Sequence, residues 1–542
     1  MRHKLLLCLL LILFSVCSMH SQEFNAVWAK SIGWYNNEYA SEMAIDINGN
    51  IWGVAYIDGP VDTINNMGLE DVYLFKSDSD GNVLFECSFG GGDKDRGYHL
   101  AIDEHNSCWV SGYFNDTMWI GSHYLVSKGY SDAFLIKFSS TGQLLWETNL
   151  GNTGFDQGKH LAIIANAVYW SGNFQGSIII GNDTIQGNTT SDNYLIKMDT
   201  SGNFIWARQW GAPGIEDILG LNINSHDQVL VASLYSDAVF VNGDTLSGNT
   251  TGNTLLTKYD RFGNVVWNYT FGGISSGIDQ DENDNIYLTG SYQNTISING
   301  QQLIPFEEFD AFVLSLDSNA QFRWLCPLQG NDLIMSNNLL WNESRQELYV
   351  YGIYQGTIFY GNDSLERYTI GPSHINDDIF VLALDANGNT LNSQKFDGEW
   401  ASNMVVDNSS NAIYMFGTYQ SITEIDAITL IAFGGLELFL AKFNIQTVGV
   451  NTITKTTHQK PLIFPNPVDR DSYLTFEITD PSDIIIRMVD INGCIIKEIL
   501  EGELAIGNYA IPLQLDKKTH PGLYFILFQS EIQTDCIKFI KP

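Results

Sequence analysis

The chain has 542 residues, of which 44% are apolar and 13% aromatic, so it can bury more than one core and is not disordered by composition. It carries 27 basic against 62 acidic residues, a net charge of −35, most of it within residues 22–451. Such a surface repels phosphate backbones and anionic lipid, which argues against nucleic-acid binding.

The first residues predict an export signal. Arg2, His3 and Lys4 give a basic start, and the apolar run Leu5–Val16 after them is too short to span a membrane. We expect residues 1–21 to be a signal peptide, cleaved after Ser18 or Ser21. Lipidation at Cys17 is a less favoured alternative because bulky Val16 precedes it. No later segment is apolar enough to span a membrane.

One phrase recurs seven times at intervals of roughly 60 residues, which is typical of repeat architectures. It is a polar residue, an apolar strand often ending in Lys, a Gly turn and a strand carrying Trp. The copies start at Asp71, Asp132, Asp192, Asn253, Asp310, Asp378 and Glu437. A second phrase, with Gly two residues before an aromatic residue, keeps the same interval, as in Gly112 with Phe114 and Gly172 with Phe174.

Each repeat predicts four antiparallel strands, exemplified by Leu100–Ile102, Cys108–Gly112, Phe134–Phe138 and Leu144–Glu147, with a small hairpin such as Trp119–Val126 before the third. The array begins with an unpaired fourth strand, Ala26–Lys30, and ends with an unpaired third strand, Leu438–Lys442. Pairing these two would close a ring and remove exposed sheet edges. We therefore expect an all-β fold with a seven-bladed β-propeller over residues 22–445.

The repeat phrases lack the Trp-Asp signature of one common propeller family. They resemble the repeats of bacterial extracellular β-propeller proteins, and the resemblance spans residues 23–443. It implies the fold more than a function.

A polar, Thr-rich stretch, residues 446–460, predicts a linker, and residues 461–542 predict a small β-sandwich. This last domain carries Pro465-Asn466-Pro467, then Asp490, Asn492 and Gly493, and then Gly522 and Tyr524 before a final strand ending in Lys541. In this order at the C-terminus, the motifs resemble the type A sorting domain of type IX secretion in Bacteroidota. The resemblance implies that the type IX secretion machinery is a partner, and that the protein is secreted or attached to the outer-membrane surface.

Calcium is the cofactor that the sequence suggests most directly. Asp279, Asp281, Asn283 and Asn285 alternate as oxygen ligands of a calcium loop do, and Asp46-x-Asn48-x-Asn50 is a shorter relative. The sixth and twelfth positions of such a loop, Asp284 and Gly290, do not fit. The favoured alternative is a hairpin turn stabilised by Asx hydrogen bonds. We expect no other cofactor.

No catalytic residue is predicted. No nucleophile elbow follows a strand, and the histidines at 99, 105, 123, 160, 226 and 374 show no shared spacing and no adjacent acid–base partner. The tryptophans at 146, 206, 267 and 324 recur at one repeat position, which favours packing between blades over ligand contact.

Another recurring pattern is Asp-Thr or Asp-Ser before an apolar residue. It resembles the O-glycosylation sequon of Bacteroidota, which would place sugar on Thr63, Thr117, Thr184, Thr245 and Ser364. A plain turn-to-strand signal also explains the pattern and is the favoured interpretation.

The leading hypothesis is therefore a non-enzymatic binding or adhesion protein whose extracellular glycan or protein ligand is unknown. The alternative is a secreted polysaccharide- or protein-degrading enzyme with its site at the propeller axis. Acids and a histidine gathered at the axis would favour the enzyme.

Overall fold

The computed structural model describes most of the chain from Ser21 to Lys541. The described ranges are 21–33, 36–59, 68–181, 183–187, 191–211, 214, 216–236, 238–241, 243–248, 252–306, 309–361, 363–367, 377–398, 400–426, 428–448, 462–464, 468, 472–478, 481–489, 495–513, 515, 522–529 and 534–541. The chain divides into two compact units, Met1–Val448 and Gly449–Pro542. The signal peptide predicted for residues 1–21 lies outside the described residues except for Ser21.

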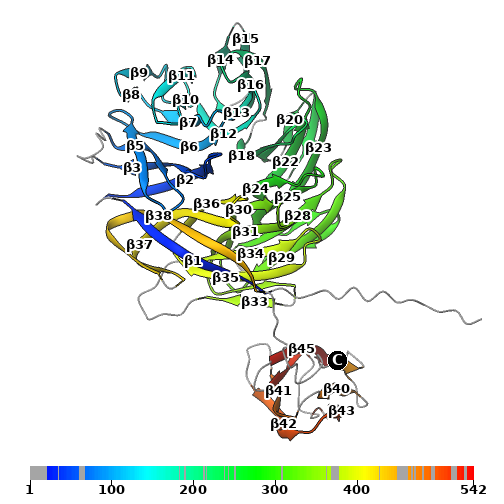
Figure 1. The fold of residues 1–542 in the computed structure, drawn as a ribbon. Helices are drawn as coiled ribbons and strands as arrows, with labels where there is room; N and C mark the ends of the chain where they lie inside the picture. The colour runs from blue at the N-terminus through cyan, green and yellow to red at the C-terminus, as the bar shows by residue number, and fades with distance from the viewer. Residues whose placement is uncertain are drawn as a thin grey trace, which may run out of the picture. The chain divides into compact units, whose positions relative to one another are not determined.

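Unit 1 is all-β in its described residues and consists mainly of four-stranded antiparallel sheets in chain order, consistent with the blades of a propeller (Figure 1). The sheets of its first half are β2 (Glu38–Ile45), β3 (Ile51–Asp58), β4 (Glu70–Ser77) and β5 (Val83–Phe89); β6 (Asp95–Ile102), β7 (Cys108–Phe114), β10 (Asp132–Phe138) and β11 (Leu144–Leu150); β12 (Gln157–Ile164), β13 (Ala167–Phe174), β16 (Asp192–Asp199) and β17 (Phe204–Trp210); and β18 (Glu216–Ile223), β19 (Val229–Tyr235), β22 (Asn253–Tyr259) and β23 (Val265–Gly272).

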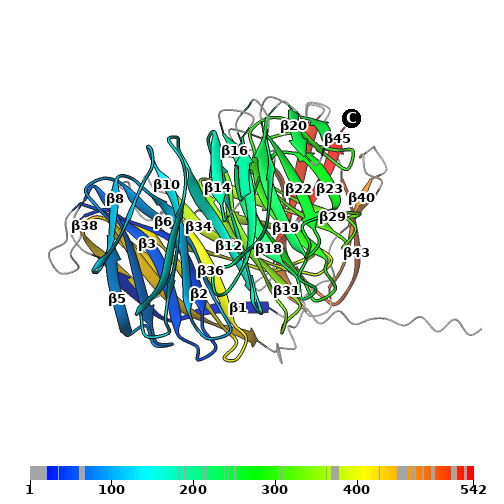
Figure 2. The same ribbon diagram turned by 90° about the horizontal axis from the view of Figure 1, so that it is seen from above.

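The later sheets keep the same order. They are β24 (Ile274–Gln280), β25 (Ile286–Tyr292), β28 (Asp310–Leu316) and β29 (Phe322–Gly330); β30 (Ile334–Asn342), β31 (Glu347–Tyr354), β34 (Asp378–Asp385) and β35 (Thr390–Asp397); and β36 (Trp400–Asp407), β37 (Ala412–Ile425), β38 (Ile428–Val448) and β1 (Ser21–Ile32). Figure 2 shows strands of successive sheets running side by side.

Small hairpins occupy the connection between the second and third strands, where the sequence predicts one. They are β8 (Thr117–Ile120) with β9 (His123–Val126), β14 (Ser177–Ile180) with β15 (Asp183–Gln186), β20 (Ala238–Val241) with β21 (Asp244–Ser247), β26 (Ile296–Ile298) with β27 (Gln301–Leu303), and β32 (Thr357–Tyr360) with β33 (Asp363–Glu366). The first strand of each hairpin contacts the fourth strand of the preceding sheet, as β8 does with β5. β32 pairs with β29, so β24, β25, β28, β29, β32 and β33 form one six-stranded sheet. The hairpins therefore join neighbouring sheets at their outer edge.

The first strands contact one another in a closed succession. β2 contacts β6, each later first strand contacts the next through β12, β18, β24 and β30, and β36 contacts β2. These strands lie toward the middle of unit 1 in Figure 1. Side chains on the first strands consequently share one axial region although they come from distant parts of the sequence.

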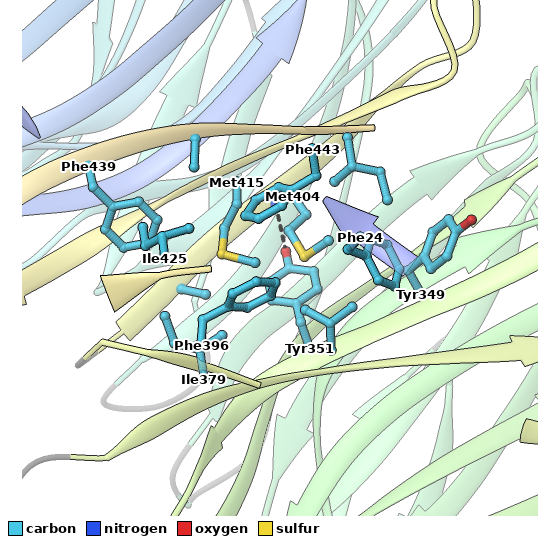
Figure 3. Packing of buried hydrophobic residues seen from close by; sticks show 14 of the residues in the cluster. Phe24, Tyr349, Tyr351, Ile379, Phe396, Met404, Met415, Ile425, Phe439 and Phe443 are labelled. Atoms are coloured by element: carbon cyan, nitrogen blue, oxygen red, sulfur yellow. Dashed lines mark hydrogen bonds between the residues drawn. The ribbon is translucent and has the colours of Figure 1, made fainter. Parts of the chain in front are cut away.

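The N-terminal strand completes the last sheet of unit 1. β1 pairs antiparallel with β38, with Trp28 opposite Lys442, which confirms the predicted pairing of the two unpaired strands. Phe24 of β1 packs edge-on against Tyr349 at 5.5 Å within a core that also holds Phe396 and Phe443 (Figure 3). β38 continues to Val448, so Gln446–Val448, predicted to be linker, extend this strand instead.

Unit 2 contains two antiparallel sheets around one hydrophobic cluster. One sheet is β39 (Leu462–Phe464), β40 (Tyr473–Ile478) and β43 (Gly507–Pro512), and the other is β42 (Ile495–Leu504), β41 (Ser482–Val489), β44 (Gly522–Gln529) and β45 (Thr534–Lys541). Leu474, Phe476 and Ile526 belong to the shared cluster.

Candidate functional site

Each first strand of unit 1 contains one β-bulge at an equivalent place. The register with the second strand shifts between Ala40 and Glu42, Gly97 and His99, Gly158 and His160, Ile218 and Gly220, Ser275 and Gly277, Ser336 and Asn338, and Ala401 and Asn403. A bulge inserts one residue and re-aims the side chains beside it. The bulge recurs in all of these first strands, whereas the residue that follows it varies among Glu, His, Gly and Asn.

Four of these bulge residues form a polar group, which we call the axial cluster: Glu42, His99, His160 and Asn403. Glu42 Oε2 lies 3.5 Å from His99 Nε2, and the Asn403 amide donates to Glu42 Oε1. The rings of His99 and His160 meet edge-on at 5.3 Å between centroids. His99 Nδ1 and Asn403 Oδ1 are buried atoms without a hydrogen-bond partner among the described residues.

Burial keeps the axial cluster uncharged near neutral pH. Desolvation raises the pKa of Glu42 to about 8, although the Met43 amide opposes it, and lowers the pKa of His99 to about 4. Desolvation, with the nearby His99 and Lys159, lowers the pKa of His160 to about 3. Near neutral pH Glu42 is therefore mostly a protonated acid beside a neutral imidazole.

A second group is the aromatic–cation strip. Its first-strand members, near the N-terminal ends, are Tyr39, Arg96, Tyr98 and Lys159, and its second-strand members, near the C-terminal ends, are Tyr56 and Tyr113. Tyr39 and Tyr56 stack at 4.8 Å, and the Arg96 guanidinium lies over Tyr56 at 4.6 Å. Tyr98 contacts Tyr113 at 5.5 Å, and Lys159 Nζ lies over Tyr98 at 4.8 Å. Aromatic faces and cations from the first and second strands of successive sheets thus alternate along one surface.

The two cations of the strip are held differently. Arg96 donates through Nε and Nη2 to both carboxylate oxygens of Glu70, which Lys94 also contacts at 2.7 Å. Among the described residues, the one carboxylate that Lys159 contacts is Asp217, whose Oδ2 lies 3.5 Å away on a side chain that is 39% exposed. Lys159 is therefore the cation of the strip that is freer to bind a ligand.

The recurring tryptophans pack between sheets, as their recurrence in the sequence favours. A Cβ at Gly202 would lie 2.6 Å from the Trp146 ring, so the turn of one sheet sits on the indole of the preceding one. Trp206, Trp267 and Trp324 each donate Nε1 to a carbonyl in the turn of the next sheet, at 3.1, 3.1 and 2.9 Å. Packing between neighbouring sheets therefore explains why tryptophan recurs at this position.

The candidate calcium loop forms an Asx turn. Asp281 Oδ1 accepts the backbone N–H groups of Asn283 and Asn285 at 2.9 Å, and Asn285 Nδ2 donates to Asp281 Oδ2 at 2.8 Å. Asp279 instead accepts from the Trp341 N–H at 2.7 Å and from the Asn222 amide. Asp46 makes the same turn with Asn48 and Asn50. These hydrogen bonds agree with the interpretation of both loops as Asx-stabilised hairpin turns, and calcium binding stays a prediction.

Across the described residues, no group of three or more His, Cys, Asp or Glu side chains is arranged to hold a metal ion. Within the same part of the chain, no helix is long and apolar enough to cross a membrane.

Three of the five candidate glycosylation residues are exposed at equivalent hairpin positions: Thr184, Thr245 and Ser364. Each lies directly across its hairpin from an exposed apolar residue, in turn Ile179, Phe240 and Phe359. Thr117 is only half-buried and begins the other strand of its hairpin, and Thr63 lies outside the described residues. Modification stays a prediction at all five.

Most of the sorting motif lies outside the described residues, namely Pro465, Asn466, Pro467, Asp490, Asn492 and Gly493. Of the remainder, Gly522 begins β44, and Tyr524 is buried against Phe539 with ring centroids 5.8 Å apart. Tyr524 is therefore part of the hydrophobic core of unit 2.

The axial cluster was not predicted from the sequence. The interpretation that the histidines share no spacing is wrong for His99 and His160, which occupy the same bulge position in consecutive repeats. Aligning the repeats by their first strands would have revealed this, and would have placed Glu42 in line with them. The aromatic–cation strip, in contrast, includes residues of second strands that only the fold brings together.

No family model matches the chain. It is 24% identical over 292 residues to the regulatory protein FlaEY of Caulobacter vibrioides, a match that covers 48% of this chain and 30% of that protein. It is 21% identical over 262 residues to an uncharacterized WD repeat-containing protein of Acanthamoeba polyphaga mimivirus, covering 41% and 19%. The matches therefore span less than a third of either relative.

Solved structures that resemble the chain include a member of the DUF4221 family from Bacteroides vulgatus, 10% identical with a TM-score of 0.32, covering 79% of this chain and 99% of that one. A protein of unknown function from Bacteroides caccae is 10% identical with a TM-score of 0.28, covering 56% and 93%. The polysaccharide lyase Uly1 is 9% identical with a TM-score of 0.42, covering 78% and 100%. At these TM-scores none of the three carries an argument about function.

Proposed function

We propose that this chain is an exported binding protein that captures an extracellular ligand on the aromatic–cation strip of unit 1. The observation that carries the proposal is the contrast between repeated and unrepeated residues. Tryptophans, turn glycines and strand-end lysines recur because packing needs them, whereas the strip occurs once. Residues that depart from a structural repeat and gather on one surface are candidates for recognition.

The scaffold in this proposal is a seven-bladed propeller. Two observations support it: the succession of first-strand contacts returns from β36 to β2, and β1 supplies the fourth strand of the last sheet. A closed ring has no free sheet edge and holds its axial side chains rigidly. Such rigidity lowers the entropic cost of binding.

Export and surface localisation are part of the same proposal. The basic and apolar start of the chain supports a signal peptide. The order of the motifs from Pro465 to Lys541 supports a type IX sorting domain, which we propose is a small β-sandwich formed by the two sheets of unit 2. Secretion of the full chain in a strain with and without the type IX machinery tests this part, and unchanged secretion would contradict it.

The binding proposal is tested by presenting the full exported chain to an array of surface polysaccharides and extracellular proteins, with calcium and with a chelator. We expect saturable binding to one ligand class, weakened in a Tyr98→Ala variant and retained in a matched Tyr130→Ala variant. Tyr130 is 68% exposed and stacks on Phe155, outside the first strands. Loss of binding in chelator would support calcium as a cofactor, and no binding to any class would contradict the proposal.

A second candidate is an enzyme that cleaves an extracellular polymer. The pairing of Glu42 with His99 supports it, because a protonated acid beside a neutral imidazole supplies the two roles of general acid–base catalysis. Shortened products from any polymer on the array, absent with a Glu42→Gln variant, would favour the enzyme over the binding protein.

A further inference from the structure

The first strands of unit 1 carry few cations. Among their described residues, Arg96 and Lys159 are the only Lys or Arg side chains, and both lie over tyrosine rings of the aromatic–cation strip. The chain as a whole has a net charge of −35. On such an acidic protein, cations on neighbouring first strands create a local region in which a bound anion is less strongly repelled.

Lys159 is the side chain available to an anion. It is 20% exposed beside Tyr98 and reaches Asp217 only at 3.5 Å, whereas Arg96 is neutralised by Glu70 through two bonds. An ion pair at this distance near solvent contributes little to stability. A ligand carboxylate that makes a direct charge-assisted hydrogen bond to Lys159 can therefore replace it.

Of the acids near the strip, Glu70 is paired with Arg96 and Lys94, and two buried acids are mostly neutral near neutral pH. Burial raises the pKa of Glu42, on β2 beside β6, to about 8. Burial also raises the pKa of Asp95, next to Arg96, to about 8, although the Gly91 and Asn115 amides that donate to its carboxyl oppose the shift. Both carboxyls are mostly neutral at pH 7, which leaves Asp217 as the exposed acid facing Lys159.

The rest of the surface suits a sugar ring. Tyr98 presents its ring to Lys159, whose Nζ lies 4.8 Å from the ring centre, and the buried Tyr113 packs against Tyr98. Aromatic faces pack against the apolar faces of sugar rings, while the hydrogen-bonding groups between them suit hydroxyls. An acidic peptide such as poly-glutamate could pair its carboxylates with Lys159, but it has no ring to pack against the tyrosines.

We infer that the aromatic–cation strip binds a polysaccharide that carries carboxylate groups, with a uronic acid carboxylate on Lys159 and its sugar ring against Tyr98. This inference rests on the proposed binding function and names the ligand class for the same surface. It involves no covalent step.

The test is isothermal titration of the full exported chain with polygalacturonate, with the same polymer after reduction of its carboxyl groups, and with poly-glutamate. The variants are Lys159→Gln, Lys159→Arg and, as the matched control, Lys94→Gln. Lys94 is a more exposed cation, paired with Glu70 and outside the first strands. Thermal unfolding of each variant confirms that it is folded.

We expect polygalacturonate to bind, the reduced polymer to bind at least about tenfold more weakly, and poly-glutamate not to bind. Lys159→Gln is expected to weaken polygalacturonate binding by about tenfold, and Lys159→Arg and Lys94→Gln by less than about threefold. Equal binding of the reduced polymer, equal binding of poly-glutamate, or an unaffected Lys159→Gln variant would overturn this inference and leave the binding function standing. If no ligand class on the array binds, both this inference and the proposed binding function are contradicted.

Discussion

At the scale of single residues, the lysine that ends many third strands joins three parts of unit 1. Lys137 Nζ lies 3.0 Å from Asp103 Oδ2, 4.7 Å from the centre of the Trp109 ring, and 3.2 Å from the carbonyl of Thr200 in the next sheet. Lys76 and Lys197 repeat the arrangement with Asp46 and Asp227. The lysine of the repeat phrase is therefore structural, holding a turn of its own sheet to a turn of the next.

Replacing Lys137 with Met is expected to destabilise unit 1 by about 3 kcal/mol, because it leaves the fully buried Asp103 carboxylate without its cation. Chemical denaturation measures the change in the free energy of unfolding. The control is Lys94→Met, at a side chain 46% exposed, which should cost less than about 1 kcal/mol. Equal effects in the two variants would contradict the structural role of Lys137.

Buried acids with raised pKa values make the folded state sensitive to alkaline pH. Desolvation raises the pKa of Asp95 to about 8 and that of Asp156 to about 6, both well above the unfolded value. Between the folded and unfolded pKa values the folded state holds protons that the unfolded state has lost, so stability falls as pH rises. For Asp95 the loss runs from about pH 4 and is complete above about pH 8.

Asp95→Asn, which imitates the protonated acid, is expected to raise the unfolding temperature at about pH 9 and to leave it nearly unchanged at about pH 5. Differential scanning calorimetry across this pH range measures the difference. A variant that is destabilised equally at both pH values would show that Asp95 is ionised in the folded state.

At the scale of elements, the turn between third and fourth strands shows how far local sequence determines structure. The predicted Gly turns form, with Gly142, Gly202 and Gly263 at positive φ, and the register shifts at the end of each third strand. Asp199 and Asp260 accept backbone N–H groups within these turns, as Asx turns require. Turn chemistry is local, and so it could be predicted.

Gly202→Ala is expected to cost about 2–3 kcal/mol, because the residue has φ +86° and its Cβ would lie 2.6 Å from Trp146. Gly49→Ala, at φ +78° with no heavy atom within 4 Å, should cost only the conformational strain of about 1 kcal/mol. Thermal unfolding compares the two. Similar losses of stability in the two variants would mean that the turn at Gly202 can move enough to avoid the clash with Trp146.

The bulges of the first strands could not be predicted in the same way. An inserted residue such as Tyr98 or Lys159 leaves no composition signal, because its effect is visible only against the register of the neighbouring strand. The sequence therefore predicts which strands exist but not which of their side chains are re-aimed toward the axial region.

At the scale of the whole molecule, the repeat interval predicts the succession of sheets, and the unpaired strands at its two ends predict the pairing of β1 with β38. The axial cluster was not predicted because Glu42, His99 and Asn403 belong to different repeats, and their shared position appears only when the repeats are aligned by their first strands. Only the return of β36 to β2 brings Asn403 beside Glu42.

Two deletions distinguish the strand that closes unit 1 from the separate unit 2. Removing residues 449–542 is expected to leave the unfolding temperature of unit 1 within about 2 °C, because the chain divides into two compact units at Val448. Removing residues 22–33 should abolish its cooperative unfolding, because β38 would keep β37 but lose its other partner strand and expose an edge. Calorimetry of both deletions checks this, and a cooperative transition after loss of β1 would contradict it.

The contact between β1 and β38 also sets the order in which the protein can mature. β1 pairs with β38, and Phe24 in β1 also exchanges hydrogen bonds with the Gln394 side chain of β35, 370 residues later, so β1 cannot complete its contacts until these later strands have been synthesised. Contacts of such sequence separation form slowly, and until then an unpaired edge and its apolar face remain exposed. A chain that crosses a membrane unfolded would need protection from aggregation until β1 pairs with β38. A chain that crosses folded must complete this pairing before it crosses.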